Sequence, residues 1–378
     1  MTSVWTKDHI STITEQPYTA VPVITADNVK PLAEGLVFWD MWPVQLSDGS
    51  IAQINDGALW MLLSAPDRGD PALRHFEAKV RLMHYAGGVW RDLGPALPEM
   101  MVSYEREWAG TALLQGDVVT LFFTAAGRAD IPGGYQQQLF ETHGRLQDDG
   151  RITDWTFPVI SVENDGAHYP VADQQSGEPG KITAFRDPAY FCDPADGQEY
   201  LIFSASVVGS ASAYRGAMGI ARKTASSKWE LLPALIHADG VNNELERAHV
   251  VAHEGRYYAF WSTQASTFNP DGPIGPTGLY GMVANSLFGQ YEPLNETGLV
   301  LANPKEEPSQ TYSWHVTKEL LVSSFIDHWG LKGRSLTGNP SLVADSFGGT
   351  AAPFLRIALT GNQSQLAVTC DNDKLAHG

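Results

Sequence analysis

One short pattern recurs along the chain and restricts its fold more than any other feature. Gly116, Gly197 and Gly255 each follow a turn residue and lead into an apolar strand, in the segments QGDVVTLFFT, DGQEYLIFSA and EGRYYAFWST. Their spacing is too uneven for a strict solenoid, but it suits a β-propeller whose four-stranded blades carry loop insertions. At roughly 60 to 80 residues per blade, the 378 residues would hold about five blades.

Short runs of β-branched and aromatic residues between turn residues predict an all-β chain. Examples are residues 58–65, 118–124, 200–206 and 257–263. The segment from Trp5 to about Glu15 is the best helical candidate, and residues 1–30 are expected to wrap around the body in helical and extended form. We therefore predict one domain over residues 1–378, a five-bladed β-propeller with a central funnel-shaped pocket.

The composition excludes several classes of protein. The 25 Lys and Arg against 43 Asp and Glu give a net charge of −18, which argues against a nucleic-acid partner. No run approaches the roughly 18 apolar residues of a membrane span, and the start lacks the basic-then-apolar order of a signal peptide. We expect no membrane partner, and a location in the cytoplasm or outside the cell after non-classical export.

Cysteine and histidine patterns give no sign of a metal. Cys192 and Cys370 are too few and too far apart for a disulfide framework or a CxxC site, so both are predicted to be free thiols. The 11 histidines include no HxxxH or HxH pair, and no twelve-residue calcium loop is present. No metal or cofactor is expected, and the sequence leaves the oligomeric state open.

Four carboxylates, each in or beside an apolar strand, lie nine or ten residues ahead of a turn glycine. They are Asp40, Glu107, Asp187 and Glu246, in FWDMWP, REWAG, FRDPAYF and ELERAHVV. Equivalent strands of successive blades would aim them at one axis, where like charges shift one another's pKa values. The alternatives are a turn-initiating Asp before Pro43, a surface ion pair at Asp187 and a solvated strand edge at Glu246.

Aromatic neighbours indicate what such a pocket would hold. Trp39 and Trp42 flank Asp40, and indole faces stack on the C–H surfaces of sugars, which favours a carbohydrate site. Through these and other motifs, most of the chain resembles glycoside hydrolase family 68, the levansucrases, inulosucrases and related bacterial β-fructofuranosidases. The matching elements are residues 5–6, 39–43, 107–110, 185–188, 244–247, 275–281, 291–304, 311–313, 324–327 and 348–353.

The resemblance implies a fold and a role for particular residues. The family is a five-bladed β-propeller with a central pocket, as the repeat already suggests. Asp40 would be the nucleophile, Asp187 the residue that stabilises the transition state, and Glu246 the general acid and base. The residues implied to hold the substrate are Trp39, Trp108, Arg186, Glu244, Arg247, Gln264 and Tyr312.

The expected function is that of a retaining, sucrose-cleaving fructosyltransferase that works through a covalent fructosyl-enzyme, with appreciable hydrolysis. Its partners would be sucrose and the fructosyl acceptors water, sucrose and fructan chains. A dedicated β-fructofuranosidase is the alternative within the family. A non-catalytic carbohydrate-binding propeller, or a glycosidase acting on arabinan or xylan, would share the fold.

Several positions depart from the family pattern, among them residues 203–206, which read FSAS in place of FEGN or FEAN. Gln264 stands where the family usually has His or Arg, a cation associated with holding glucose and then the acceptor. Ala248 replaces the usual Pro, and Asn243 replaces an Asp of the calcium site of some members, so no bound calcium is expected. Residues 66–100 and 128–180 also diverge, and contacts at the pocket rim cannot be carried over from the family.

Overall fold

The structure is a computed structural model that describes residues 2–13, 18–177 and 181–367. Within these ranges the chain forms four hydrogen-bonded sheets and a few short helices. The predicted all-β class is therefore confirmed. Cys192 is a free thiol, as predicted, whereas Cys370 lies outside the described residues.

The largest sheet consists of two antiparallel segments. The first holds β2 (Leu36–Gln45), β4 (Gly57–Pro66), β5 (Lys79–Ala86) and β6 (Val89–Pro95), with β3 (Gln53–Ile54) paired to β4. The second holds β7 (Arg106–Gln115), β8 (Val118–Ala126) and β9 (Gln137–Leu146), with β10 (Ile152–Thr153) and β11 (Val159–Val162) both paired to β9. A short parallel pairing of β2 with β7 joins the two segments.

The other three sheets follow in chain order. The first contains β12 (Phe185–Cys192), β13 (Glu199–Ser206), β14 (Gly216–Lys223) and β15 (Trp229–His237), with β1 (Ser3–Val4) at its edge. The next contains β16 (Glu246–His253), β17 (Arg256–Thr263), β18 (Gly278–Ala284), β19 (Glu292–Pro293) and β20 (Leu299–Ala302). The last contains β21 (Thr311–Val316), β22 (Leu321–His328), β23 (Phe347–Ala351), β24 (Leu355–Thr360) and β25 (Gln363–Ala367).

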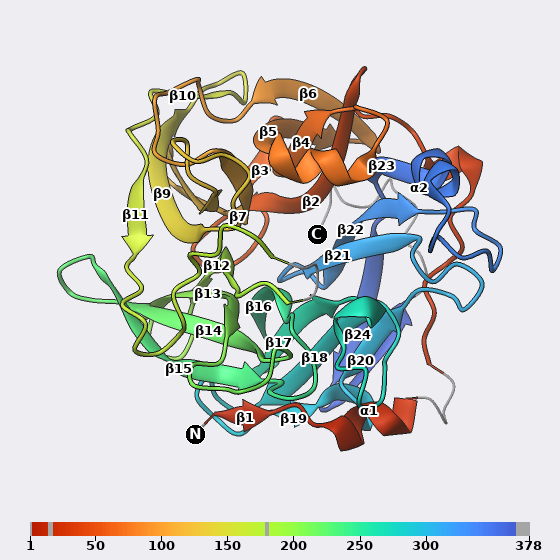
Figure 1. The fold of residues 1–378 in the computed structure, drawn as a ribbon. Coiled ribbons are helices and arrows are strands. Elements are labelled where there is room, and N and C mark those ends of the chain that lie inside the picture. Colours follow the sequence, from red (N-terminus) through yellow and green to blue (C-terminus); the bar gives the residue numbers. More distant parts are fainter. Residues whose placement is uncertain (1, 14–17, 178–180, 368–378) are drawn as a thin grey trace.

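The first strands of these segments lie nearest the centre of the molecule (Figure 1). They contact one another in sequence, β2 with β7, β7 with β12, β12 with β16, β16 with β21, and β21 again with β2. A strand that is buried on both faces reads as a nearly continuous apolar run rather than an alternating one. Strand β4, the second strand of its segment, is such a strand and is buried from Gly57 to Ala65.

The three glycines of the repeated sequence pattern occupy equivalent turns. Gly116, Gly197 and Gly255 lie between the first and second strands of their sheets, with φ values of 65°, 73° and 73°. At these angles an L side chain is strained, which explains why glycine is used. The predicted repeat is confirmed at these positions.

Helices are short and lie outside the sheets. Helix α1 (Lys7–Ile13) falls inside the predicted helical segment, whose residues 14–15 lie outside the described ranges, and α2 (Pro340–Ser346) precedes β23. The 3-10 helices are η1 (Ala26–Asn28), η2 (Pro71–Phe76), η3 (Ala265–Thr267) and η4 (Leu294–Glu296). No helix in the described part of the chain is long and apolar enough to cross a membrane.

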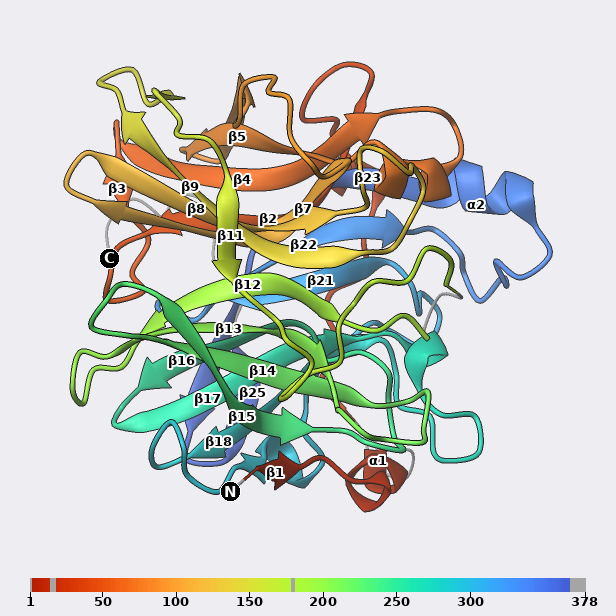
Figure 2. The same ribbon diagram turned by 60° about the vertical axis from the view of Figure 1, so that its left-hand side comes forward.

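The N-terminal segment is anchored by one tryptophan. Trp5 is fully buried against Trp261, Phe268 and Tyr280, and its indole N–H donates to the Thr297 carbonyl at 3.0 Å. Strand β1 adds to β15 on one side, and α1 lies beside it (Figure 2). The segment therefore ties the sheet of β12–β15 to the sheet of β16–β20.

Candidate active site

Each inner strand carries a β-bulge at the same depth. The pairing with the second strand shifts just after Trp39, Trp108, Arg186, Glu246 and Tyr312. An extra residue at a bulge re-aims side chains that a regular strand would point elsewhere. Three bulge residues, Asp187, Arg247 and Ser313, have left-handed φ values of 60°, 55° and 56°.

Left-handed backbone at a residue other than glycine costs about 1–3 kcal/mol and clusters at functional sites. Here three such residues lie on neighbouring inner strands. The strain therefore marks one layer across the centre of the molecule, where Asp40, Asp187 and Glu246 also lie.

Asp187 is held from several sides. Its side chain accepts hydrogen bonds from the Ser204 hydroxyl at 3.1 Å and from the Arg247 amide at 3.4 Å. Its own amide donates to the Thr124 hydroxyl at 2.8 Å, a contact from the neighbouring sheet. Asp187 is only 5% exposed, so its position is fixed by protein groups rather than by solvent.

The Arg186 guanidinium connects three carboxylates. Its Nη2 lies 3.2 Å from Glu244 Oε1 and 3.3 Å from Glu246 Oε1, and its Nε lies 3.6 Å from Asp187 Oδ2. Arg186 and Glu244 are themselves buried. A buried charge of this kind is stabilised only where opposite charges surround it. Removing any one of these four side chains would therefore destabilise the charges of the others.

Glu246 has a second partner on the next inner strand. The Tyr312 hydroxyl donates a short hydrogen bond to Glu246 Oε2, while Arg186 approaches Oε1. Both oxygens of this carboxyl group are therefore oriented. The predicted residues Arg186, Glu244, Glu246 and Tyr312 are brought together.

Arg247 joins the site through the bulge. Strand alternation would point its side chain away from the pocket, but the left-handed backbone turns its guanidinium toward β2. There Nη2 donates to the Met41 carbonyl at 3.1 Å, Nη1 lies 4.0 Å from Asp40 Oδ2, and the group lies over the Trp42 ring. Asp40 and Asp187 are thus linked through Arg247.

Burial controls the ionisation of the carboxyl groups. It raises the pKa of Asp40, Asp187 and Glu244, because few waters remain to solvate their charges; Arg186 and Arg247 lower the pKa of Asp187 but do not outweigh burial. The Arg186 charge therefore favours the ionised form of Asp187, while burial favours the protonated form. Such closely spaced groups share protons, so the cluster retains a proton at higher pH than a free carboxyl group would.

A loop that the sequence comparison could not place completes the wall of the site. Helix η2 carries Arg74 and His75: the Arg74 guanidinium lies 5.7 Å from the Trp39 ring centre, and the His75 ring packs edge-on against Trp39. Trp108 donates its indole hydrogen to the His75 carbonyl at 3.3 Å. The buried Nε of Arg74 has no hydrogen-bond partner among the described residues.

Arg74 also acts on the acids electrostatically. Its charge lowers the pKa of Asp40, and the charges of Asp40, Glu246 and Asp327 act on Arg74 in return. Sequence reasoning missed this arginine, because residues 66–100 diverge from the family pattern. The one available signal was a basic residue in the loop between β4 and β5.

Two predicted residues lie elsewhere. Glu107 does not join the acids, since it accepts from the Val80 amide at 2.8 Å and pairs with Lys79 at 3.1 Å. Gln264 follows β17, one residue after Thr263, whose hydroxyl donates to the Glu244 carbonyl. The Gln264 side-chain oxygen accepts from the Ser266 hydroxyl at 3.3 Å, and no contact with the acids is present in the described residues.

The donor set for a metal is also absent from the described part of the chain, where no group of three or more His, Cys, Asp or Glu side chains is placed to hold an ion. Asn243, at the family's calcium position, donates its side-chain amide to the Ala213 carbonyl at 2.7 Å. This hydrogen bond joins the connection between β15 and β16 to the loop between β13 and β14.

An all-β fold whose inner strands gather carboxylates, arginines and indole rings defines a carbohydrate-active enzyme of the kind that works with paired carboxylates. The family comparison specifies which kind. The chain belongs to the Levansucrase/Invertase family, glycoside hydrolase family 68, whose model matches residues 1–215 and 207–374. The resemblance seen in the motifs is confirmed.

Individual relatives agree with this assignment. A levansucrase of Pseudomonas savastanoi pv. glycinea, LscC, is 32% identical over 411 aligned positions, covering 96% of this chain and 90% of the relative. An inulosucrase from Halalkalicoccus jeotgali, solved bound to kestose, superposes with a TM-score of 0.90 at 37% identity, over 99% of this chain and 97% of that one. A levansucrase from Gluconacetobacter diazotrophicus shares the fold, with a TM-score of 0.82 at 23% identity, over 100% and 92% of the two chains.

Proposed function

We propose that this protein is a sucrose-cleaving fructosyltransferase that acts with retention through a covalent fructosyl-enzyme and also hydrolyses sucrose. The observation that carries the proposal is the meeting of Asp40, Asp187 and Glu246 in one bulge layer, bridged by Arg186 and Arg247. A module that only binds sugar would have no need for this strained and charged arrangement.

The proposed architecture is a five-bladed β-propeller formed by a single domain. The contacts of β2, β7, β12, β16 and β21 in cyclic order support it, as does the bulge in the pairing of each of these strands with its second strand. In this arrangement the acids would come from the first strands of three blades. The pocket would then open along the axis, between η2 and the end of β17.

In the first half-reaction, one oxygen of ionised Asp40 attacks the anomeric carbon of the fructosyl unit. The bond from that carbon to the bridging oxygen breaks, its electron pair stays on the oxygen, and Glu246 supplies the proton that completes glucose. Asp187 holds the fructosyl unit and stabilises the positive charge that develops on its ring. The products of this step are glucose and a fructosyl ester of Asp40.

In the second half-reaction, Glu246 removes a proton from the acceptor hydroxyl as its oxygen attacks the same carbon. The ester bond breaks and Asp40 regains its charge, so two inversions give net retention. Arg186 and Tyr312 contact Glu246 and stabilise its carboxylate between the two steps. Water as the acceptor gives fructose, whereas sucrose or a fructan chain gives a longer product.

The rim supports a second candidate, a dedicated β-fructofuranosidase. Gln264 is neutral and is engaged by Ser266, so this position offers an acceptor sugar no cationic hydrogen-bond donor of the kind that His or Arg supplies. A sugar acceptor held less firmly competes less well with water. The two candidates differ only in the fate of the fructosyl-enzyme.

The test is the product mixture formed from concentrated sucrose. Glucose released in excess of free fructose, together with oligosaccharides or polymer, is expected for the transferase. Equal glucose and fructose at every sucrose concentration would favour the hydrolase. Turnover of arabinan or xylan but not sucrose, or unchanged sucrose turnover in Asp40→Asn, would reject the proposal.

A further inference from the structure

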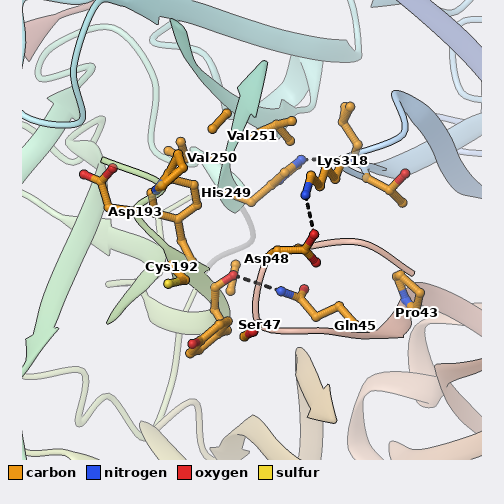
Figure 3. A pocket seen from close by; sticks show the side chains of 18 of the residues that line it. Pro43, Gln45, Ser47, Asp48, Cys192, Asp193, His249, Val250, Val251 and Lys318 are labelled. Carbon is orange, nitrogen blue, oxygen red and sulfur yellow. Dashed lines mark hydrogen bonds and ion pairs between the residues drawn. The ribbon is translucent and has the colours of Figure 1, made fainter. Parts of the chain in front are cut away.

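A second pocket lies on the opposite side of the bulge layer. Its volume is about 290 Å³, and it is lined by residues that follow the bulges along β2, β12, β16 and β21, among them Gln45, Cys192, His249, His315 and Lys318 (Figure 3). None of Asp40, Asp187 and Glu246 lines it. The bulge layer therefore separates the proposed reaction site from this pocket.

His249 is the side chain that connects the pocket to the bulge layer. Its Nδ1 lies 2.7 Å from the Arg247 carbonyl oxygen, and its Nε2 accepts from the Val316 amide at 3.0 Å. An imidazole that donates from one nitrogen and accepts at the other is neutral. Burial lowers the pKa of His249 to about 4, so the ring stays neutral at the pH of ordinary assays.

Both ends of the bulged segment at Arg247 are thus tied. On one side the Arg247 amide donates to Asp187, and on the other its carbonyl accepts from His249. The guanidinium reaches Met41 and Asp40 from the same left-handed backbone. If the carbonyl were released, the bulge could relax toward ordinary strand geometry, and both contacts with the acids would change.

The Val316 contact extends the restraint to the next sheet. Val316 ends β21, the strand that also carries Tyr312 and the left-handed Ser313. His249 therefore links the inner strand that carries Glu246 to the inner strand that holds it in place. Its ring also packs against the His315 ring, with ring centres 4.4 Å apart and the ring planes inclined by 38°.

We infer that His249 is a positioning residue for fructosyl transfer: by fixing the Arg247 carbonyl from the far side of the bulge layer, it sets the position of the Arg247 amide and guanidinium against Asp187 and Asp40. The inference rests on the proposed function. Wild-type protein that does not turn over sucrose would remove the function itself, whereas the comparisons below test His249 only if the wild type is active.

Two substitutions separate the two hydrogen bonds. In His249→Asn the side-chain amide nitrogen can occupy the place of Nδ1 and donate to the Arg247 carbonyl, while the acceptor for Val316 is lost. In His249→Gln the amide oxygen can replace Nε2 and accept from Val316, while the donor to Arg247 is lost. The inference requires the kcat of His249→Gln to fall about 100-fold below that of the wild type. His249→Asn should keep most of the wild-type kcat.

The pH profile supplies a readout that a purely structural role would not move. The charged and titratable groups that face Asp187 are Arg186, Arg247, Asp40, Glu244 and Glu246. A hydrogen bond to the ionised form lowers the pKa of a carboxyl group, so loosening the Arg247 amide raises the pKa of Asp187. The acid limb of kcat/KM should move to higher pH in His249→Gln and stay in place in His249→Asn.

His84 offers a matched control. It is buried on β5, away from the bulge layer, and its Nε2 bonds to the Ile54 carbonyl at 3.0 Å. His84→Ala removes a comparable contact and should leave kcat and the acid limb unchanged. Equal kcat and equal profiles for wild type and His249→Gln, at matched melting temperature, would overturn the inference, as would a folded His249→Asn that is as impaired as His249→Gln.

The neighbouring pocket allows a rescue experiment. His249→Gly extends the pocket by the volume of the ring, and added imidazole can enter from that side and donate to the Arg247 carbonyl. Imidazole should restore kcat in His249→Gly in a saturable manner and leave the wild type unaffected. A folded His249→Gly with wild-type kcat would contradict the role assigned here, and a loss of activity that imidazole fails to reverse would contradict access through the pocket.

Discussion

Tyr312 donates its hydroxyl hydrogen to Glu246, a residue on the first strand of the neighbouring sheet. A hydrogen bond to a charged group contributes about 1.5–3 kcal/mol, which corresponds to roughly 10- to 100-fold in rate. Tyr312→Phe should lower kcat for sucrose by that factor. Tyr258→Phe, which removes a hydroxyl bonded to the distant Gly361 carbonyl, should have no effect, and a kcat within twofold of wild type for Tyr312→Phe would contradict the contact's role.

Glu246→Gln should slow hydrolysis and transfer together, because the same residue protonates glucose and deprotonates either acceptor. Positioned proton transfer contributes about 10²- to 10⁴-fold, and the loss should fall in that range. Initial rates of glucose and fructose release measure both reactions. A variant that retained one of the two reactions at the wild-type rate would exclude Glu246 from the shared role.

Gln264→His or Gln264→Arg should shift products toward longer chains, since a cation at the rim can hold the departing glucose and then a sugar acceptor. The ratio of transferred to free fructose, measured at one sucrose concentration, should rise. Gln264→Asn, which keeps a neutral amide, is the control. Identical product profiles for the His, Arg and Asn variants would show that this position does not govern acceptor retention.

Arg74→Gln should move the acid limb of kcat/KM to higher pH. The Arg74 charge lowers the pKa of Asp40, and Asp40 must be ionised to attack, so removing the charge raises the pH at which the nucleophile becomes available. Arg68→Gln is the matched control, because Arg68 belongs to the same loop but pairs with Glu77 in an exposed position. An unshifted limb in Arg74→Gln would show that the arginine does not reach the nucleophile.

Buried carboxyl groups make the stability of the folded state fall between acidic and neutral pH. Because burial raises the pKa of Asp187 above the ordinary value of about 4, the folded state binds its proton more tightly than the unfolded state does, and stability falls as pH rises through the folded pKa. Asp187→Asn carries no titrating group at this position. Its free energy of unfolding should therefore fall less than that of the wild type between about pH 5 and about pH 8. Parallel denaturation midpoints for the two proteins across that range would contradict this.

The part of the site that sequence could predict is the part that repeats. Turn glycines and apolar strands located the inner strands, and motif matches placed Asp40, Asp187 and Glu246 among them. Counting back from the glycine failed at Glu107, for a geometric reason. Gly116 begins its two-residue turn, whereas Gly255 follows Glu254 and ends its turn.

This difference shifts the count by one residue, and a shift of one residue along a strand moves a side chain to the opposite face. Trp108, not Glu107, therefore occupies on β7 the position that Glu246 occupies on β16. Each is the last paired residue before the bulge of its strand. The bulges themselves were not predicted, because Arg247 and Ser313 are not residue types that favour left-handed backbone, and a single Asp such as Asp187, though tolerant of it, does not identify a bulge. Neither could the placement of Arg74 be predicted, since it depends on how η2 folds back onto Trp39.

A bulge resets the phase of the strand beyond it. Because β2, β12, β16 and β21 are each reset once, a single strand presents one set of side chains to the compartment with the acids and an independently phased set to the compartment with His249 and His315. Substitutions on one side of the bulges therefore leave the side chains on the other side in place. Only the few residues at the bulges themselves affect both sides.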